Sequence, residues 1–101
     1  MRIEFERSGG VAGLRLSLSI DTDTLPEAEA EEIEKLVEAS GFFEMPERTG
    51  TPSGADAFVY RVKVESAERA HTVTTSDIDA PSELSPLLER LERLARRARR
   101  E

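Results

Sequence analysis

The sequence predicts an α+β fold: a single domain in the order ββαββα, with a four-stranded antiparallel sheet and two helices packed on one of its faces. Three observations support this prediction. Four segments alternate apolar with polar residues, two segments repeat apolar residues at helical spacing, and 101 residues suffice for one core. We therefore expect one domain over residues 1–101, with a basic helical tail at about residues 96–101.

The first two predicted strands flank a glycine-rich segment. Ile3 and Phe5 alternate with charged residues in residues 1–7, and four apolar residues alternate with polar ones in residues 14–20. Residues 8–13, between them, read Ser-Gly-Gly-Val-Ala-Gly. We expect a hairpin with a long loop, because a turn alone needs only one or two glycines.

A helix is predicted next. Residues 21–24 supply N-cap candidates, Pro26 suits the first turn and Gly41 suits the C-cap. Phe42 and Phe43 follow, and we expect at least one of them to anchor the end of the helix in the core. The side chains expected to face the core recur at helical spacing: Ala30, Ile33, Leu36, Val37 and Ser40.

The second half of the chain repeats the pattern of two strands and a helix. Residues 44–56 contain two prolines and two glycines without periodicity, which predicts a long loop and a candidate functional element. Residues 58–64 and 71–75 alternate as strands, joined by a turn at 66–68. The last helix is expected to hold Pro86 in its first turn. Its apolar face comprises Leu84, Leu87, Leu88, Leu91, Leu94 and Ala95.

The composition excludes several classes of site. The absence of cysteine excludes disulfides, thiol nucleophiles and cysteine-ligated zinc, and the single histidine, His71, excludes a two-histidine metal site. No apolar run is long enough to span a membrane, and the N-terminus lacks the pattern of a signal peptide. We therefore expect a cytoplasmic protein that contacts no membrane and needs no cofactor.

The net charge of −7 is unevenly distributed. Residues 90–101 hold six arginines and two glutamates, whereas the remainder holds eight basic and nineteen acidic residues. The acidic part would repel phosphate backbones, so we expect no nucleic-acid partner. A basic helical tail can in principle bind nucleic acid or an anionic membrane, but cations near a helix C-terminus also complement the helix dipole, and we favour this structural role.

No enzyme signature is found among the polar residues. His71 lies in an alternating strand, where a packed or hydrogen-bonded histidine is the common case, and no serine has the Gly-x-Ser-x-Gly setting of a hydrolase. Asp21-Thr22-Asp23 lacks the glycine and the glutamate of a calcium loop. Residues 8–13 join two strands and contain no lysine, unlike a phosphate loop. Their small side chains permit close approach of another backbone, as in a loop that enters a cleft.

Several segments together carry a resemblance to a known family. Residues 5–13, Gly-Ala-Asp at 54–56 and Phe-x-Tyr-Arg at 58–61 form a set that resembles the emfourin family of protein inhibitors of thermolysin-like metallopeptidases. The resemblance continues through the Leu-Pro pair before the first helix, the Phe-Phe pair after it, the His-Thr-Val strand and the start of the last helix. It therefore spans nearly the whole chain. Val11 departs from the family pattern, which leads us to expect an aromatic residue there.

The resemblance implies a stoichiometric inhibitor whose partner is a thermolysin-like zinc metallopeptidase, and a chain that is not itself an enzyme. We expect a monomer that occludes the active-site cleft sterically without ligating the zinc, because residues 8–13 contain no cysteine, histidine or carboxylate. A second contribution is expected from residues 48–54. The residues expected to contact the peptidase are Ser8, Gly9, Gly10, Val11, Ala12, Gly13, Arg48, Thr49 and Gly50.

Two other classes of function stay open. A regulatory or adaptor module would bind another protein through its helical or basic-tail surface, and deletion of residues 96–101 would then cause a large loss of binding. An inhibitor would lose little on the same deletion. A small enzyme is disfavoured by the missing catalytic residues, and would need support from a turnover that is lost on His71→Ala.

Overall fold

The chain forms two pairs of strands, each pair followed by a helix, as the sequence predicts. The computed structural model describes residues 1–9, 15–48, 58–77 and 80–100. The predicted α+β class and the order ββαββα are confirmed. The elements are β1 (Arg2–Gly9), β2 (Leu16–Asp21), the 3-10 turn η1 (Thr22–Thr24), α1 (Glu27–Ser40), the 3-10 turn η2 (Phe42–Glu44), β3 (Phe58–Glu65), β4 (Ala70–Ser76) and α2 (Ser85–Arg100).

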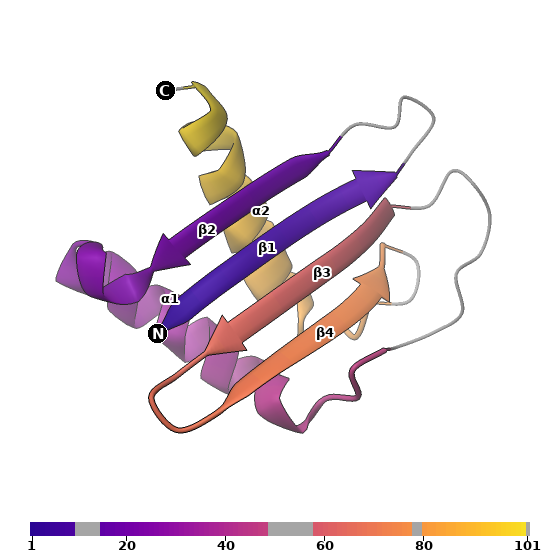
Figure 1. Cartoon of the computed structure of the whole chain (residues 1–101), viewed down its shortest axis with the longest axis horizontal. Coiled ribbons are helices and arrows are strands. Elements are labelled where there is room, and N and C mark those ends of the chain that lie inside the picture. Colours follow the sequence, from indigo (N-terminus) through magenta and orange to yellow (C-terminus); the bar gives the residue numbers. More distant parts are fainter. Residues whose placement is uncertain (10–14, 49–57, 78–79, 101) are drawn as a thin grey trace.

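The four strands form one antiparallel sheet in the order β2-β1-β3-β4. Phe5 of β1 lies opposite Leu18 of β2 and Val62 of β3, which sets the register of the central strands. Both helices lie behind the sheet in Figure 1, so they cover the same face. Because successive side chains of a strand point to opposite faces, the apolar positions turn toward the helices and the polar positions turn away.

The core lies between the covered face of the sheet and the two helices. Ile3, Val64 and Val73 on the strands, Ile33 on α1 and Leu91 on α2 are all fully buried. Burial of each such side chain contributes roughly 1.5–3 kcal/mol relative to exposure. The predicted apolar face of the last helix is confirmed, since Leu87, Leu88, Leu91, Leu94 and Ala95 of α2 are buried. Leu84, which directly precedes α2, is buried as well.

The start of α1 differs from the sequence expectation. The sequence places N-cap candidates at residues 21–24, but α1 begins at Glu27 with Pro26 at the N-cap position and no side-chain cap. The carboxylate of Asp21 instead accepts a hydrogen bond from the backbone N–H of Asp23 at 3.0 Å, and so caps η1. Pro26 suits the entry to α1 because its ring restricts φ, here −53°, to values compatible with helix initiation.

The end of α1 follows the prediction. Gly41 adopts the left-handed backbone conformation, with φ of 68°, and its N–H donates to the carbonyl oxygen of Glu38 at 3.1 Å. Glycine adopts this conformation without the penalty that a Cβ imposes. Phe42 is buried in the core and packs edge-to-face against the ring of Phe43. One phenylalanine therefore anchors the end of the helix, as expected.

β1 is longer than the predicted strand. Ser8 pairs with Val59, and Gly9 pairs with Phe58, so two residues expected in the loop belong to β1. The strand continues because β3 offers a pairing partner along its whole length. β2 begins at Leu16 rather than at Leu14, and Leu14 lies outside the described residues.

Candidate functional site

The predicted contact residues, in 8–13 and 48–54, fall in or beside two segments that lie outside the described residues, 10–14 and 49–57. The described residues that flank these two segments lie at one end of the sheet (Figure 1). The segment 10–14 follows Gly9, the last residue of β1, and the segment 49–57 precedes Phe58, the first residue of β3. Gly9 and Phe58 are paired directly across the two strands. The two segments are therefore joined to the sheet at adjacent positions.

The other flank of the second segment lies beside β4. Arg48 forms an isolated parallel bridge with Thr74, and the backbone N–H of Thr74 donates to the carbonyl oxygen of Glu47 at 2.7 Å. Thr74 is two residues from Ser76, where β4 ends. The flanking residues therefore extend from β4 to β1 across this end of the sheet, which we call the loop end.

Three of the nine predicted contact residues lie in the described part of the chain. Ser8 and Gly9 are half-buried at the end of β1, and Arg48 is exposed beside β4. The binding role of all nine residues stays a prediction. Six of them lie outside the described residues: Gly10, Val11, Ala12, Gly13, Thr49 and Gly50.

A half-buried arginine lies under the loop end. The guanidinium carbon of Arg7 is 3.8 Å from the centroid of the Phe58 ring, within the range of a cation–π contact. Its Nη1 donates to Oε1 of Glu92 on α2 at 2.7 Å, and the same oxygen accepts from Nη2 of Arg96 at 2.8 Å. Arg7 continues the core-facing alternation of Ile3 and Phe5 in β1, so its side of the sheet could be predicted from the sequence, but its contact with Glu92 could not.

The backbone of Phe58 is also held from β4. The N–H of Phe58 donates to a carboxylate oxygen of Asp77 at 3.2 Å, and the N–H of Asp77 donates to the carbonyl oxygen of Phe58 at 3.1 Å. Together with its pairing to Gly9, these bonds hold the first residue of β3 between its two neighbours. These hydrogen bonds therefore fix the position of Phe58, which begins β3 at the loop end.

Tyr60 is the second polar side chain packed beneath the loop end. Its ring is tilted against that of Phe5, with the centroids 6.2 Å apart. Burial raises the pKa of the phenol above its usual 10.0, and the charge of Glu92 raises it further, whereas Arg7 lowers it. The phenol therefore stays protonated at neutral pH and does not serve as a base.

His71 is used in packing, as the sequence analysis expects for a histidine in a strand. Its Nε2 donates to the carbonyl oxygen of Met45 at 2.6 Å, and its ring meets that of Phe42 edge-on, with the centroids 5.6 Å apart. In the described part of the chain, no three or more acidic, histidine or cysteine side chains are grouped so as to hold a metal ion. Nothing in the surroundings of His71 points to catalysis.

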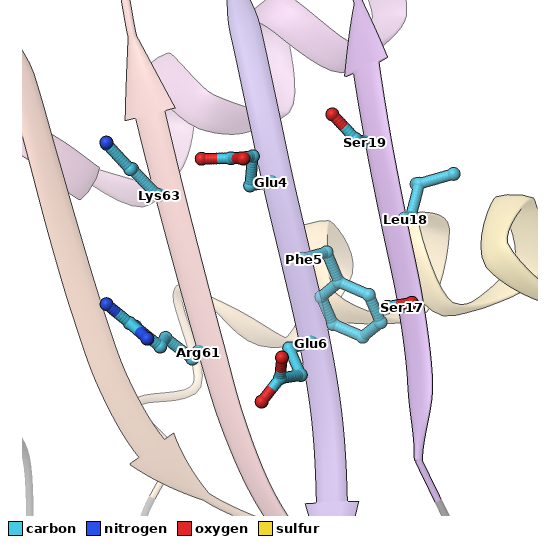
Figure 2. A pocket seen from close by; sticks show the side chains of 8 residues that line it. All are labelled: Glu4, Phe5, Glu6, Ser17, Leu18, Ser19, Arg61 and Lys63. Carbon is cyan, nitrogen blue, oxygen red and sulfur yellow. The ribbon is translucent and has the colours of Figure 1, made fainter.

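The uncovered face of the sheet carries a shallow hollow of about 370 Å³ (Figure 2). Glu4 and Glu6 of β1 lie directly opposite Lys63 and Arg61 of β3, and two serines of β2 leave room beside them. Acidic and basic side chains balance, and the residues that line the hollow include no histidine or cysteine. The hollow therefore offers a polar contact surface.

In the described part of α2, three arginines form ion pairs within the fold: Arg90, Arg96 and Arg97. Nη2 of Arg97 is 3.0 Å from Oε1 of Glu29, and Nε of Arg90 is 3.3 Å from Oε1 of Glu32, so both arginines tie α2 to α1. Arg93 is exposed and has no ion pair with another described residue. None of the helices in the described ranges has the length and apolar character needed to cross a membrane.

Comparison with protein families gives one informative result. The chain matches the family model described as Emfourin over residues 5–92, which is most of its length. The matched range includes both predicted contact segments and the described residues that flank them. Neither the comparison with curated proteins nor the comparison with solved structures finds a match.

Proposed function

Because the chain belongs to the emfourin family, we propose that it is a stoichiometric protein inhibitor of a thermolysin-like zinc metallopeptidase. The family indicates an inhibitor of metallopeptidases rather than an enzyme. The match over residues 5–92 is the observation that carries the proposal. The proposed inhibitor acts as a monomer in the cytoplasm and uses no cofactor of its own.

The proposed inhibitory surface is the loop end of the sheet. Direct pairing of Gly9 with Phe58 brings the attachment points of both segments together, which supports a single surface that includes residues 8–13 and 48–54. Two segments attached side by side fit a single concave active-site cleft better than two separated loops would. The proposed mechanism is therefore steric occlusion of the cleft.

The proposed occlusion does not involve ligation of the zinc. Zinc in proteins is bound by thiolates, imidazoles and carboxylates, and residues 8–13 contain none of these groups. The carboxylate that tests this proposal is Asp56, in the second segment. Asp56→Asn should change the inhibition constant by no more than about threefold, as for an ordinary surface substitution. A loss of about 100-fold with an unchanged melting temperature would contradict occlusion alone, because it would show that the charge of Asp56 contributes directly to binding.

The function itself is tested by titration of thermolysin-like peptidases with the protein, including any encoded beside its gene. The proposal predicts that activity falls linearly to zero near one equivalent of inhibitor. Val11→Arg should weaken the inhibition, whereas Ser19→Arg, which adds the same side chain on the uncovered face of β2, should not. Absence of inhibition by the wild-type chain at micromolar concentration would contradict the proposed function.

The adaptor alternative has less support. It would use the helical surface or the basic end of α2, but Arg90 and Arg97 are paired with glutamates of α1. These two arginines therefore have a structural role between the helices, which needs no partner protein to explain it. Failure of the titration would make this alternative the leading one.

A further inference from the structure

Arg7 lies close to the points where the two segments 10–14 and 49–57, here called the inhibitory segments, join the sheet. These points, the bases of the segments, are Gly9 and Phe58. Arg7 lies in β1 two residues before Gly9, where the first segment begins to leave the strand, and its guanidinium stacks on the ring of Phe58 at 3.8 Å. Phe58 is the first described residue after the second segment. A single side chain of β1 thus contacts the residue from which β3 starts.

Glu92 determines where the guanidinium of Arg7 lies. The ion pair between them is short, at 2.7 Å, and the two side chains are only 18% and 22% exposed. Because little water reaches this pair, the attraction between its charges is stronger than in a fully exposed pair. The planar guanidinium of arginine can also hydrogen-bond a carboxylate while its face stacks on an aromatic ring. Glu92 belongs to α2, and lies 85 positions after Arg7 in the chain.

We propose that Glu92 is a positioning residue for inhibition: through Arg7 it holds Phe58 in place, and so fixes the bases of both inhibitory segments relative to each other. This inference rests on the proposed function, since it assigns a role in the same surface. It goes beyond that function by placing one determinant of affinity on the covered side of the sheet, in a helix that supplies none of the predicted contact residues.

Fixing the base of a binding loop in advance increases affinity. Association must otherwise order the loop, at a cost that is subtracted from the binding free energy. Without the charge of Glu92, Arg7 retains no other ionic partner among the described residues, and its position over Phe58 becomes one of several rotamers. We expect weaker inhibition as the result, with the sheet and the core intact.

Glu29 provides a matched control. Its carboxylate contacts two arginines, Arg97 at 3.0 Å and Arg90 at 3.7 Å, and its side chain is 19% exposed. Glu92 likewise contacts two arginines, Arg7 and Arg96. Both glutamates pair with arginines of α2 or β1, but the contacts of Glu29 join α1 to α2 and include no residue of the loop end.

The experiment compares Glu92→Gln with Glu29→Gln in the full chain. Each variant is examined for its inhibition constant, its melting temperature and the amide hydrogen exchange of Phe58. We expect a similar decrease in melting temperature for both, but an inhibition constant raised about tenfold or more for Glu92→Gln and less than about threefold for Glu29→Gln. The amide of Phe58 should exchange faster only in Glu92→Gln.

A second variant tests whether Glu92 acts through the ring. Phe58→Leu keeps an apolar side chain but removes the surface on which Arg7 stacks. If the proposed route is correct, Glu92→Gln should add little to the loss caused by Phe58→Leu, since both changes break the same chain of contacts. Full additivity of the two losses would overturn the route through Phe58.

The failure of the inference is distinguishable from the failure of the proposed function. Wild-type chain that inhibits, together with equal inhibition constants for Glu92→Gln and Glu29→Gln, would overturn the inference and leave the function standing. Wild-type chain that inhibits no metallopeptidase would overturn the function. In that case the exchange of the Phe58 amide still decides whether Glu92 holds the base of the segments.

Discussion

His71 and Tyr60, the single histidine and the single tyrosine of the sequence, are both used in packing. His71 donates to a backbone carbonyl and meets the ring of Phe42, while Tyr60 packs on Phe5 beside Arg7 and Glu92. The sequence was sufficient to predict a packed histidine, because a lone histidine in an alternating strand has no catalytic partner nearby. The environment of Tyr60 depends on α2 and required the structure.

The environment of Tyr60 predicts a measurable titration. Tyr60 is the only tyrosine of the chain, so the absorbance of the ionised phenol reports this residue alone. Because burial and Glu92 raise its pKa, we expect a midpoint above 10.0 in the folded protein and near about 10 in urea. A midpoint at or below 10.0 in the folded protein would contradict the burial described here.

The same shift in the pKa of Tyr60 makes stability depend on alkaline pH. The folded state holds the phenolic proton more tightly, so the stabilisation is complete below pH 10 and is lost as the pH rises through the folded pKa. Lys63, whose pKa is raised by its hydrogen bond with Glu65, acts in the same direction. Tyr60→Phe should therefore reduce, but not abolish, the decrease in unfolding free energy above pH 10, as measured by urea denaturation.

At the scale of elements, local patterns predicted most of the fold. Period-two alternation identified four strands, and helical spacing identified both helices, because each element buries one face. The prediction for the start of α1 was wrong in detail, since Pro26 rather than a polar side chain occupies the N-cap position. The contact of Arg7 with Glu92 could not be predicted, because it depends on where α2 crosses behind β1.

We expect the end of α2 to stabilise the fold rather than to bind the peptidase. Deletion of residues 96–101 removes the contacts of Arg97 with Glu29 and of Arg96 with Glu92, but leaves the pair of Glu92 with Arg7 and the buried leucines of α2 in place. We expect a slightly lower melting temperature and an inhibition constant changed by less than about threefold, because exposed ion pairs contribute little. Arg97→Gln, which removes only the contact with Glu29 and does not shorten α2, is the control.

A loss of inhibition of tenfold or more on this deletion, without a similar loss in Arg97→Gln, would assign binding to the end of α2. That outcome would support the adaptor surface, since a folded core alone does not require these residues. The deletion therefore separates a structural role of the basic end from a role in recognition.

At the scale of the whole molecule, the described residues offer several candidate surfaces: the loop end of the sheet (Figure 1), the hollow on the uncovered face of the sheet (Figure 2), and the basic end of α2. The emfourin family indicates an inhibitor but does not say which surface binds the peptidase. The sequence singled out residues 8–13 from their glycines and small side chains, and residues 48–54 as part of a long loop without periodicity. The structure adds that their flanking residues meet at one end of the sheet.

The most direct test of this account is amide hydrogen exchange of the protein, alone and in complex with an inhibited metallopeptidase. The account predicts slower exchange on binding in peptides that contain residues 8–15 and 48–58, and unchanged exchange in β2 and in the last turns of α2. Protection confined to β2 and β3 on the uncovered face, or to the end of α2, would contradict it.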